Sequence, residues 1–324
     1  MSSLLQKAPQ LPKSERDFRE ILQRIHPFIL KTPVLSGSYF DEECDTQLFF
    51  KCENFQKIGA FKARGALNAL LRLTPEQLKN GVATHSSGNH AQALAYAAKV
   101  VGTKALIVMP SNSAKVKTQG VQRLGGEIIW CEPNTQDRES KLNAVVKQTG
   151  AYFVPPYNHE WIIGGQGTAA IELMDEVQDL DILVAPTGGG GLLSGTALAA
   201  AMVNPQIVVY GAEPEALNDA ARSFESGKIE TNPPEAFTIA DGLRTSLGEL
   251  TLGCILKHVK QILTVTEGEI ILAMQTIWER LKITAEPSSA VALAAVLKNK
   301  GLFSGKRVGI IISGGNVDLS DLPF

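Results

Sequence analysis

The fold is decided by the stretch Ile182-Leu183-Val184-Ala185-Pro186-Thr187-Gly188-Gly189-Gly190-Gly191-Leu192. Its apolar run, its four glycines and the Leu/Ala-rich residues up to Leu198 predict a buried strand, a turn without side chains and a helix. Residues without a Cβ allow backbone N–H groups to converge on an anion, and the first turn of the helix adds unpaired donors and the positive end of its dipole. The stretch therefore predicts a phosphate site, with a glycine-rich hairpin or linker as the alternative. Because the dinucleotide and P-loop spacings are both absent, the phosphate is not expected to be that of a dinucleotide or of ATP in a P-loop.

Composition and charge exclude several classes of partner. The chain has 324 residues, 44% of them hydrophobic, and its 31 basic and 33 acidic residues give a formal net charge of -2. A globular protein with one or two cores is therefore expected, and there is no electrostatic reason for it to bind nucleic acid or an anionic membrane. The polar residues 1–13 contain no apolar core of a signal peptide. The four cysteines lack the paired spacing of a zinc site and are too few for a disulfide framework, so a reducing cytoplasm fits best: Cys44, Cys52, Cys131 and Cys254.

Short β-branched runs alternate with Ala/Leu-rich helical patterns along most of the chain. Strands are predicted at 105–109, 127–130, 182–185, 207–210 and 308–312. This alternation is typical of an α/β protein whose mainly parallel sheet is covered by helices. In such open sheets ligands bind beyond the carboxyl ends of the strands, so the segments that follow the strands are candidate sites. These segments are 86–90, 188–191, 213–214 and 313–316.

A second candidate site lies at residues 53–66, where Lys62 is expected near the start of a helix. The helix dipole disfavours an ammonium there, and the neighbouring Phe61 can desolvate it. Both effects lower the pKa of the lysine and favour the neutral amine that attacks a carbonyl. Taken alone, the more common alternative is a solvated surface lysine.

These segments together carry the resemblance to a known family. A nucleophilic lysine, a glycine cup for phosphate, and hydroxyl or amide groups at strand ends are what pyridoxal 5'-phosphate requires. The chain resembles the fold-type II (tryptophan synthase β-like) pyridoxal-phosphate enzymes, and within them the serine/threonine dehydratase and serine racemase group. The resemblance extends from about Phe28 to Asp318 and rests on the motifs at 60–65, 86–90, 188–191 and 313–316.

The resemblance implies an architecture. Two open, mainly parallel sheet domains covered by helices would hold the cofactor in the cleft between them. Residues 1–79 and 155–324 would form a large cofactor-binding domain, and residues 80–154 a small domain. The family also implies a homodimer.

The resemblance also assigns roles around the cofactor. Lys62 would bind it through a Schiff base and later remove the substrate α-proton, and Phe61 would lie against the pyridine ring. Asn89 would donate a hydrogen bond to the ring 3'-oxygen. The phosphate would be held by backbone N–H groups of Gly188, Gly189, Gly190, Gly191 and Leu192.

Ser313 is the residue that matches the family's partner for the pyridine nitrogen. A neutral hydroxyl cannot hold that nitrogen protonated as a carboxylate would, so the ring is a weaker electron sink. Loss of a β-substituent or exchange of the α-proton is then favoured over transamination. The alternative for Ser313 is a small residue that ends a buried strand.

Further residues are matched to the substrate. Ser86, Ser87, Gly88 and His90 belong to the loop that receives the substrate carboxylate or its surroundings, although this loop taken alone is more typical of an ordinary turn before a helix. Ser87 also matches the second acid/base of serine racemases. Arg138 matches a racemase arginine near the substrate, with a solvated surface arginine as an equal alternative.

A divalent cation site is implied by Glu213, Leu217 and Asp219, which match two carboxylates and a backbone carbonyl of the racemase type. Hard oxygen ligands suit magnesium, calcium or manganese. The alternative is a helix N-terminus enriched in acidic residues.

The expected function is conversion of a β-hydroxy amino acid such as L-serine, L-threonine or 3-hydroxyaspartate to a 2-oxo acid and ammonia, together with serine racemase activity. The main alternative is an enzyme that is primarily a serine racemase. A non-catalytic protein that binds a phosphate ligand is the remote one. Ala60, Ile58 and Ala91 replace a serine, a threonine and a glycine of the family pattern, which puts activation by ATP in doubt.

Overall fold

The chain folds around two separate β-sheets. The computed structural model describes residues 9–324, apart from the side chain of Thr135. A six-stranded sheet has the order β1-β2-β10-β7-β8-β9, and a four-stranded sheet has the order β5-β4-β3-β6. All pairs are parallel except β1 with β2. The expected α/β class with two mainly parallel sheets is therefore confirmed.

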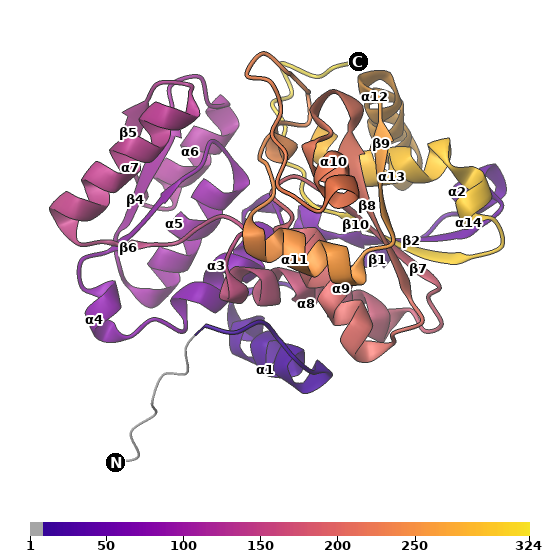
Figure 1. Cartoon of the computed structure of the whole chain (residues 1–324), viewed down its shortest axis with the longest axis horizontal. Coiled ribbons are helices and arrows are strands. Elements are labelled where there is room, and N and C mark those ends of the chain that lie inside the picture. The colour runs from indigo at the N-terminus through magenta and orange to yellow at the C-terminus, as the bar shows by residue number, and fades with distance from the viewer. Residues whose placement is uncertain (1–8) are drawn as a thin grey trace.

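The strands come from different parts of the chain. The large sheet consists of β1 (Val34–Leu35), β2 (Gln47–Cys52), β7 (Ile182–Pro186), β8 (Val208–Pro214), β9 (Gln261–Val265) and β10 (Arg307–Ile312). The small sheet consists of β3 (Val82–His85), β4 (Ala105–Pro110), β5 (Glu127–Cys131) and β6 (Tyr152–Phe153). We call residues 82–153 the small-sheet unit and the rest of the described chain the large-sheet unit. In Figure 1 the small-sheet unit lies at the left, above residues 75–78, and most of the large-sheet unit lies at the right.

Helices cover both faces of each sheet. They are α1 (Glu15–Ile25), α2 (Ser38–Cys44), α3 (Lys62–Leu70), α4 (Pro75–Leu78), α5 (Asn89–Val101), α6 (Lys115–Arg123), α7 (Thr135–Thr149), α8 (Glu160–Glu176), α9 (Gly191–Val203), α10 (Asp219–Ser226), α11 (Glu249–His258), α12 (Glu267–Thr276), α13 (Pro287–Lys298) and α14 (Lys300–Phe303). No helix within residues 9–324 is both long enough and apolar enough to cross a membrane.

Alternation along the central strands explains how the helices are distributed. On β7, Val184 packs into a core with α12 and α13, whereas its neighbour Leu183 faces the opposite core with α8 and α9. On β4, Ile107 packs with α5 while Val108 packs with α7. Strands that are buried on both faces need continuous apolar sequence, which is why the β-branched runs identified these strands.

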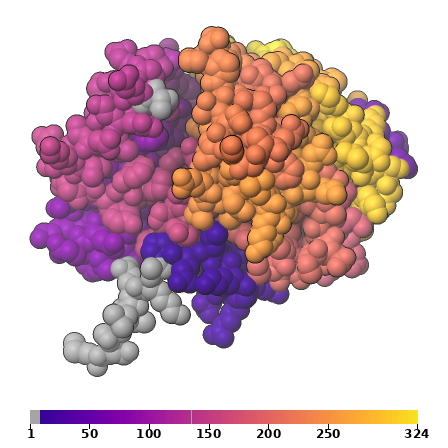
Figure 2. Space-filling model, in the orientation of Figure 1, coloured from indigo at the N-terminus to yellow at the C-terminus, as the bar shows by residue number. Residues whose placement is uncertain are grey.

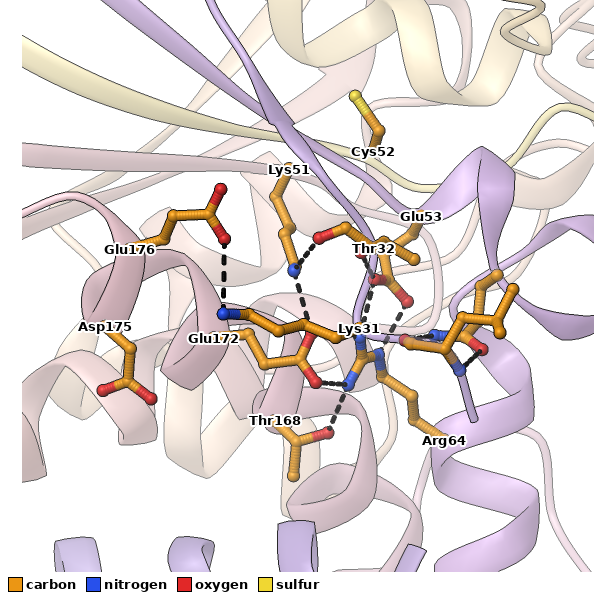
Figure 3. Close-up of polar contacts among 12 residues, drawn as sticks. Lys31, Thr32, Lys51, Cys52, Glu53, Arg64, Thr168, Glu172, Asp175 and Glu176 are labelled. Atoms are coloured by element: carbon orange, nitrogen blue, oxygen red, sulfur yellow. Dashed lines mark hydrogen bonds and ion pairs between the residues drawn. The ribbon is translucent and has the colours of Figure 1, made fainter. Parts of the chain in front are cut away.

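A buried network of four charged side chains joins β2 to α3 and α8 (Figure 3). Arg64 donates two hydrogen bonds to Glu53 and two to Glu172, at 2.7–3.0 Å. Lys51 forms an ion pair of 2.8 Å with Glu172 and donates to the backbone oxygen of Thr32. Two cations and two carboxylates balance each other, so no unpaired charge is buried. Arg64 is the third residue of α3, so the network fixes the start of this helix, where Lys62 is the first residue.

Candidate active site

One cavity lies between the two units, and the ends of several strands meet at it. Counting the space open to solvent, its volume is about 940 Å³, which suits a cofactor with a small substrate. The segments that follow β3, β7 and β10 all line it, as expected for parallel strands. Figure 2 shows the outer surfaces of the two units meeting side by side. The lining includes every residue expected to contact cofactor or substrate: Phe61, Lys62, Ser86, Ser87, Gly88, Asn89, His90, Arg138, Gly188, Gly189, Gly190, Gly191, Leu192 and Ser313.

The glycine turn between β7 and α9 has the features of a phosphate cup. Among the described residues, the N–H groups of Gly188, Gly189 and Gly190 make no backbone hydrogen bond. A Cβ on Gly189 would lie 2.4 Å from the ring of Tyr157, and Gly190 has a φ of +83°, which L-residues rarely adopt. Free donors, the absence of side chains and the start of α9 together fit a phosphate group.

Lys62 is the first residue of α3 and lines the cavity. Its Nζ donates to the backbone oxygen of Pro156 at 2.8 Å and lies 5.1 Å from the centre of the Phe61 ring. Burial lowers the pKa of Lys62 to about 8. The backbone N–H of Phe61 donates to the oxygen of Ser313 at 3.0 Å, which ties the lysine to the end of β10. An amine that loses its proton so easily suits covalent attachment of an aldehyde cofactor.

The loop after β3 presents small polar groups to the cavity. Ser86 accepts a hydrogen bond from the N–H of Gly88, whereas the hydroxyl of Ser87 has no partner among the described residues. Asn89 begins α5. His90 is buried, with Nε2 3.3 Å from the oxygen of Val154, and burial lowers its pKa to about 3. His90 is therefore a neutral ring, and it cannot offer a positive charge to a carboxylate.

Ser313 lies at the end of β10 beside a second serine that the sequence analysis missed. Its Oγ is 3.0 Å from Oγ of Ser289 on α13. Ser289 has one hydroxyl hydrogen, which it donates either to Ser313 or to the oxygen of Gly314, 2.6 Å away, and it accepts from the N–H of Gly314. No local motif marks Ser289, because only the fold brings it to Ser313.

Arg138 is half-buried on α7 and lines the cavity. Its Nε is buried and has no hydrogen-bond partner among the described residues. Nearby, Nδ1 of His85 is also buried without a partner, and the pKa of His85 is lowered by burial and by Arg138. Tyr157 also lines the cavity. An arginine without an anionic partner at this place suits an anionic group of the substrate.

Three charged residues in the cavity had no signal in the sequence. Lys117 on α6 donates to Asp241, and Glu286, which precedes α13, accepts from Nδ2 of Asn89 at 2.6 Å. Asp241 belongs to a short 3-10 helix, Asp241–Leu243. More than forty residues separate each of these groups along the chain, so local patterns cannot join them.

The residues expected to bind a cation lie outside the cavity, at the end of β8. Glu213 is within this strand rather than after it, which corrects the expected end of the strand. Both of its carboxylate oxygens accept N–H groups of α10, from Ala220 and Ala221, at 2.9 Å. Asp219 accepts from Asn232, while its buried Oδ2 has no hydrogen bond of normal geometry. Leu217, which lies between them in the sequence, is buried and ends the 3-10 helix Glu215–Leu217.

The electrostatics of this carboxylate pair would suit a bound cation. Burial is the main cause that raises the pKa of Glu213 to about 8; the neighbouring Asp219 adds to it, and the N–H groups of α10 oppose it. Two buried acidic groups without an ammonium between them are costly when both are ionised. Among the described residues there is no cluster of three or more metal-ligating side chains. A cation here would therefore also need backbone oxygen or water as ligands.

Comparisons with known proteins agree with this geometry. A family model described as "Pyridoxal-phosphate dependent enzyme" matches residues 25–314. A β-hydroxyaspartate dehydratase of Paracoccus denitrificans is 49% identical over 302 residues, which cover 93% of this chain and 96% of the relative. A serine racemase of Dictyostelium discoideum is 46% identical over 317 residues, covering 97% and 98%. The solved structure of maize serine racemase matches with a TM-score of 0.92 at 44% identity, covering 95% of this chain and 94% of that one.

Proposed function

Because the chain belongs to the pyridoxal-phosphate dependent enzymes, we propose that it converts 3-hydroxyaspartate to a 2-oxo acid and ammonia in preference to serine or threonine. The observation that carries this substrate choice is Arg138, which lines the cavity with an unpartnered Nε. Because Arg138 also matches an arginine of serine racemases, its role is tested with both substrates. 3-Hydroxyaspartate has a second carboxylate, and a guanidinium is the side chain best suited to hold it. The relatives include both a β-hydroxyaspartate dehydratase and serine racemases, so family membership alone does not decide the substrate.

The residues of the cavity have separate tasks in this reaction. When bound, pyridoxal phosphate supplies an aldehyde and an electron-withdrawing ring, which acidify the α-proton of an amino acid. The N–H groups of 188–192 would hold its phosphate, and the hydroxyl of Ser313 would be the partner for its ring nitrogen. Lys62 takes the α-proton on Nζ. Ser86 and the backbone N–H of Ser87 would hold the α-carboxylate, which leaves the Ser87 hydroxyl free, and Arg138 would hold the β-carboxylate.

The test of the substrate choice is Arg138→Met. Loss of a charge-assisted hydrogen bond weakens binding by roughly 1.5–3 kcal/mol. We expect kcat/KM for L-threo-3-hydroxyaspartate to fall about 10- to 100-fold, while kcat/KM for L-serine changes less than about threefold. Arg123→Met, at an exposed position on α6, is the matched control. An equal loss for both substrates would overturn the proposed role of Arg138.

Serine racemisation is the second candidate, and Ser87 is the observation that favours it. Its hydroxyl is free among the described residues and lines the same cavity as Lys62. A second acid that returns a proton to the face opposite the lysine would give the other enantiomer. Ser87→Ala is therefore expected to abolish D-serine formation from L-serine while 2-oxo acid still forms. Continued racemisation in this variant would exclude Ser87 as the second acid.

We also propose that Glu213, Asp219 and the backbone oxygen of Leu217 bind a divalent cation. The support is the buried carboxylate pair described above, together with the unpartnered Oδ2 of Asp219. A chelator is expected to lower the melting temperature, and magnesium, calcium or manganese to restore it. Asp219→Asn should lose this response, whereas Glu225→Gln, at an exposed position of α10, should keep it. An identical response in Asp219→Asn and in the wild type would refute the site.

Three further expectations from the sequence stay predictions. They are the homodimer, the cytoplasmic location, and the division into domains at 1–79 with 155–324 and at 80–154. Light scattering of the purified protein tests the first. The domain division is supported by the strand membership, since β3 to β6 all lie between residues 82 and 153.

A further inference from the structure

His85 and Arg138 each have a buried nitrogen atom without a hydrogen-bond partner in the part of the chain that the structure describes. The atoms are Nδ1 of His85, the last residue of β3, and Nε of Arg138, near the start of α7. Both residues line the cavity. Buried polar groups are normally hydrogen-bonded, so two unpartnered nitrogens in the wall of one cavity point to a ligand that both would bind.

The alternation of side chains along β3 brings His85 to the face of the small sheet that α7 covers. Ala83, two residues earlier, packs with Leu142 of α7, and side chains two residues apart on a strand share a face. On the neighbouring strand β6, the ring of Phe153 stacks against His85, with 6.2 Å between the ring centres and 14° between the planes. Phe153 therefore limits the orientation of the His85 ring, on the side of the sheet where α7 carries Arg138.

The two side chains differ in charge. Burial lowers the pKa of His85, the Arg138 guanidinium lowers it further, and the exposed Glu139 opposes them. The ring is therefore neutral and has one N–H donor, on either nitrogen. Arg138 is cationic, and its Nε–H is a donor as well. One positive charge and one neutral donor suit a single carboxylate, because the charges balance and both donors find an acceptor.

We infer that His85 is a specificity-determining residue for dicarboxylic amino acids, because its ring donates a hydrogen bond to the carboxylate that Arg138 also binds. The inference rests on the proposed function, in which Arg138 holds the β-carboxylate of 3-hydroxyaspartate. His85 directly precedes Ser86, which is proposed to bind the α-carboxylate. Only two carbon atoms separate the two carboxylates of this substrate, so adjacent residues of one segment can reach both. L-Serine has no anion to offer to His85 and Arg138.

The test measures binding of two amino acids that carry no β-hydroxyl. L-Aspartate has the β-carboxylate, whereas L-alanine lacks it. Each is titrated into the cofactor-loaded enzyme, and the change in cofactor absorbance gives its dissociation constant. His85→Leu should raise the ratio of the L-aspartate to the L-alanine dissociation constant about tenfold, as expected when a hydrogen bond to a charged group is lost. His85→Asn retains an N–H donor close to the place of Nδ1 and should keep this ratio within about threefold of the wild type.

A double variant separates direct contact from support of Arg138. If His85 contacts the carboxylate itself, adding His85→Leu to Arg138→Met should raise the ratio further, by at least about threefold. If the double variant has the same ratio as Arg138→Met, His85 acts only through Arg138 and the proposed contact is overturned. His26→Leu, at an exposed position that does not line the cavity, is the matched control and should have the wild-type ratio.

The same measurements distinguish failure of this inference from failure of the proposed function. A raised ratio in Arg138→Met with an unchanged ratio in His85→Leu refutes only the role of His85. An equally raised ratio in His85→Leu and His85→Asn also overturns the inference, because the asparagine retains the donor. Unchanged ratios in both His85→Leu and Arg138→Met would show that neither residue binds the second carboxylate, and the proposed preference for 3-hydroxyaspartate would be refuted as well.

Discussion

At the residue scale, the reactivity of Lys62 depends on its surroundings. The sequence predicts a lowered pKa from two causes, the helix dipole and desolvation. In the structure the pKa is lowered to about 8, and burial is the cause. The start of the helix could be predicted from the spacing of the leucines that follow. The extent of burial could not, because it comes from the distant residues around Pro156 that close over the amine.

A pH profile of cofactor loading tests this shift. Only the neutral amine attacks an aldehyde, so the rate at which apoenzyme takes up pyridoxal phosphate should rise with pH and level off above about 8. An unperturbed lysine would give a rate that still rises near pH 10. Stopped-flow absorbance measures the rate. A midpoint near the unperturbed value would show that the amine is not desolvated in solution.

Stability of the apoenzyme gives an independent check on Lys62. Between pH 8 and pH 10.5 the folded state binds fewer protons at this lysine than the unfolded state does. The contribution of Lys62 to the free energy of unfolding should therefore become more favourable as pH rises through this window. Lys62→Met lacks the group. Urea unfolding at both pH values should show a smaller gain, or a larger loss, in the variant than in the wild type.

At the scale of elements, the buried charge network holds α3 and α8 against β2. Glu172 pairs with both Arg64 and Lys51, and all three side chains are buried (Figure 3). Glu172→Gln leaves two cations facing one carboxylate. We expect the free energy of unfolding to fall by about 3–5 kcal/mol, as when one partner of a buried ion pair is removed. Urea unfolding of the cofactor-loaded enzyme measures the change.

The same helix provides the control. Glu176 lies one turn after Glu172 and forms a surface ion pair of 3.7 Å with Lys31. Glu176→Gln should cost less than about 1 kcal/mol, because exposed pairs are worth little. Equal effects of the two substitutions would mean that the network does not carry the stability assigned to it.

The helices and strands could be predicted from the sequence more completely than the contacts between them. Strands at 182–185 and 308–312 were evident because parallel strands buried on both faces need continuous apolar sequence. The end of β8 was placed too early, because Glu213 looked like a residue beyond the strand although it is paired within it. Lys117 and Glu286 carried no local signal, since their meeting depends on how the two sheets are placed.

At the scale of the whole molecule, the site exists only where the two units meet. The phosphate cup and Lys62 belong to the large-sheet unit, whereas Ser86, Ser87 and Arg138 belong to the small-sheet unit. A ligand that touches both sides stabilises their docking by its binding energy. A ligand that contacts only the glycine turn at 188–191 does not stabilise the docking of the units. Binding of the cofactor should therefore stabilise both sides of the cavity.

Hydrogen exchange of the backbone amides distinguishes these cases. Pyridoxal phosphate added to the apoenzyme should slow exchange in 188–192 and also in 86–89, because its phosphate and its ring contact different units. Inorganic phosphate should slow exchange in 188–192 alone, because it fills the cup without reaching the loop after β3. If phosphate protected both segments equally, docking of the units would be set by the anion rather than by the ring. The Asn89 amide would then have no part in joining the two units.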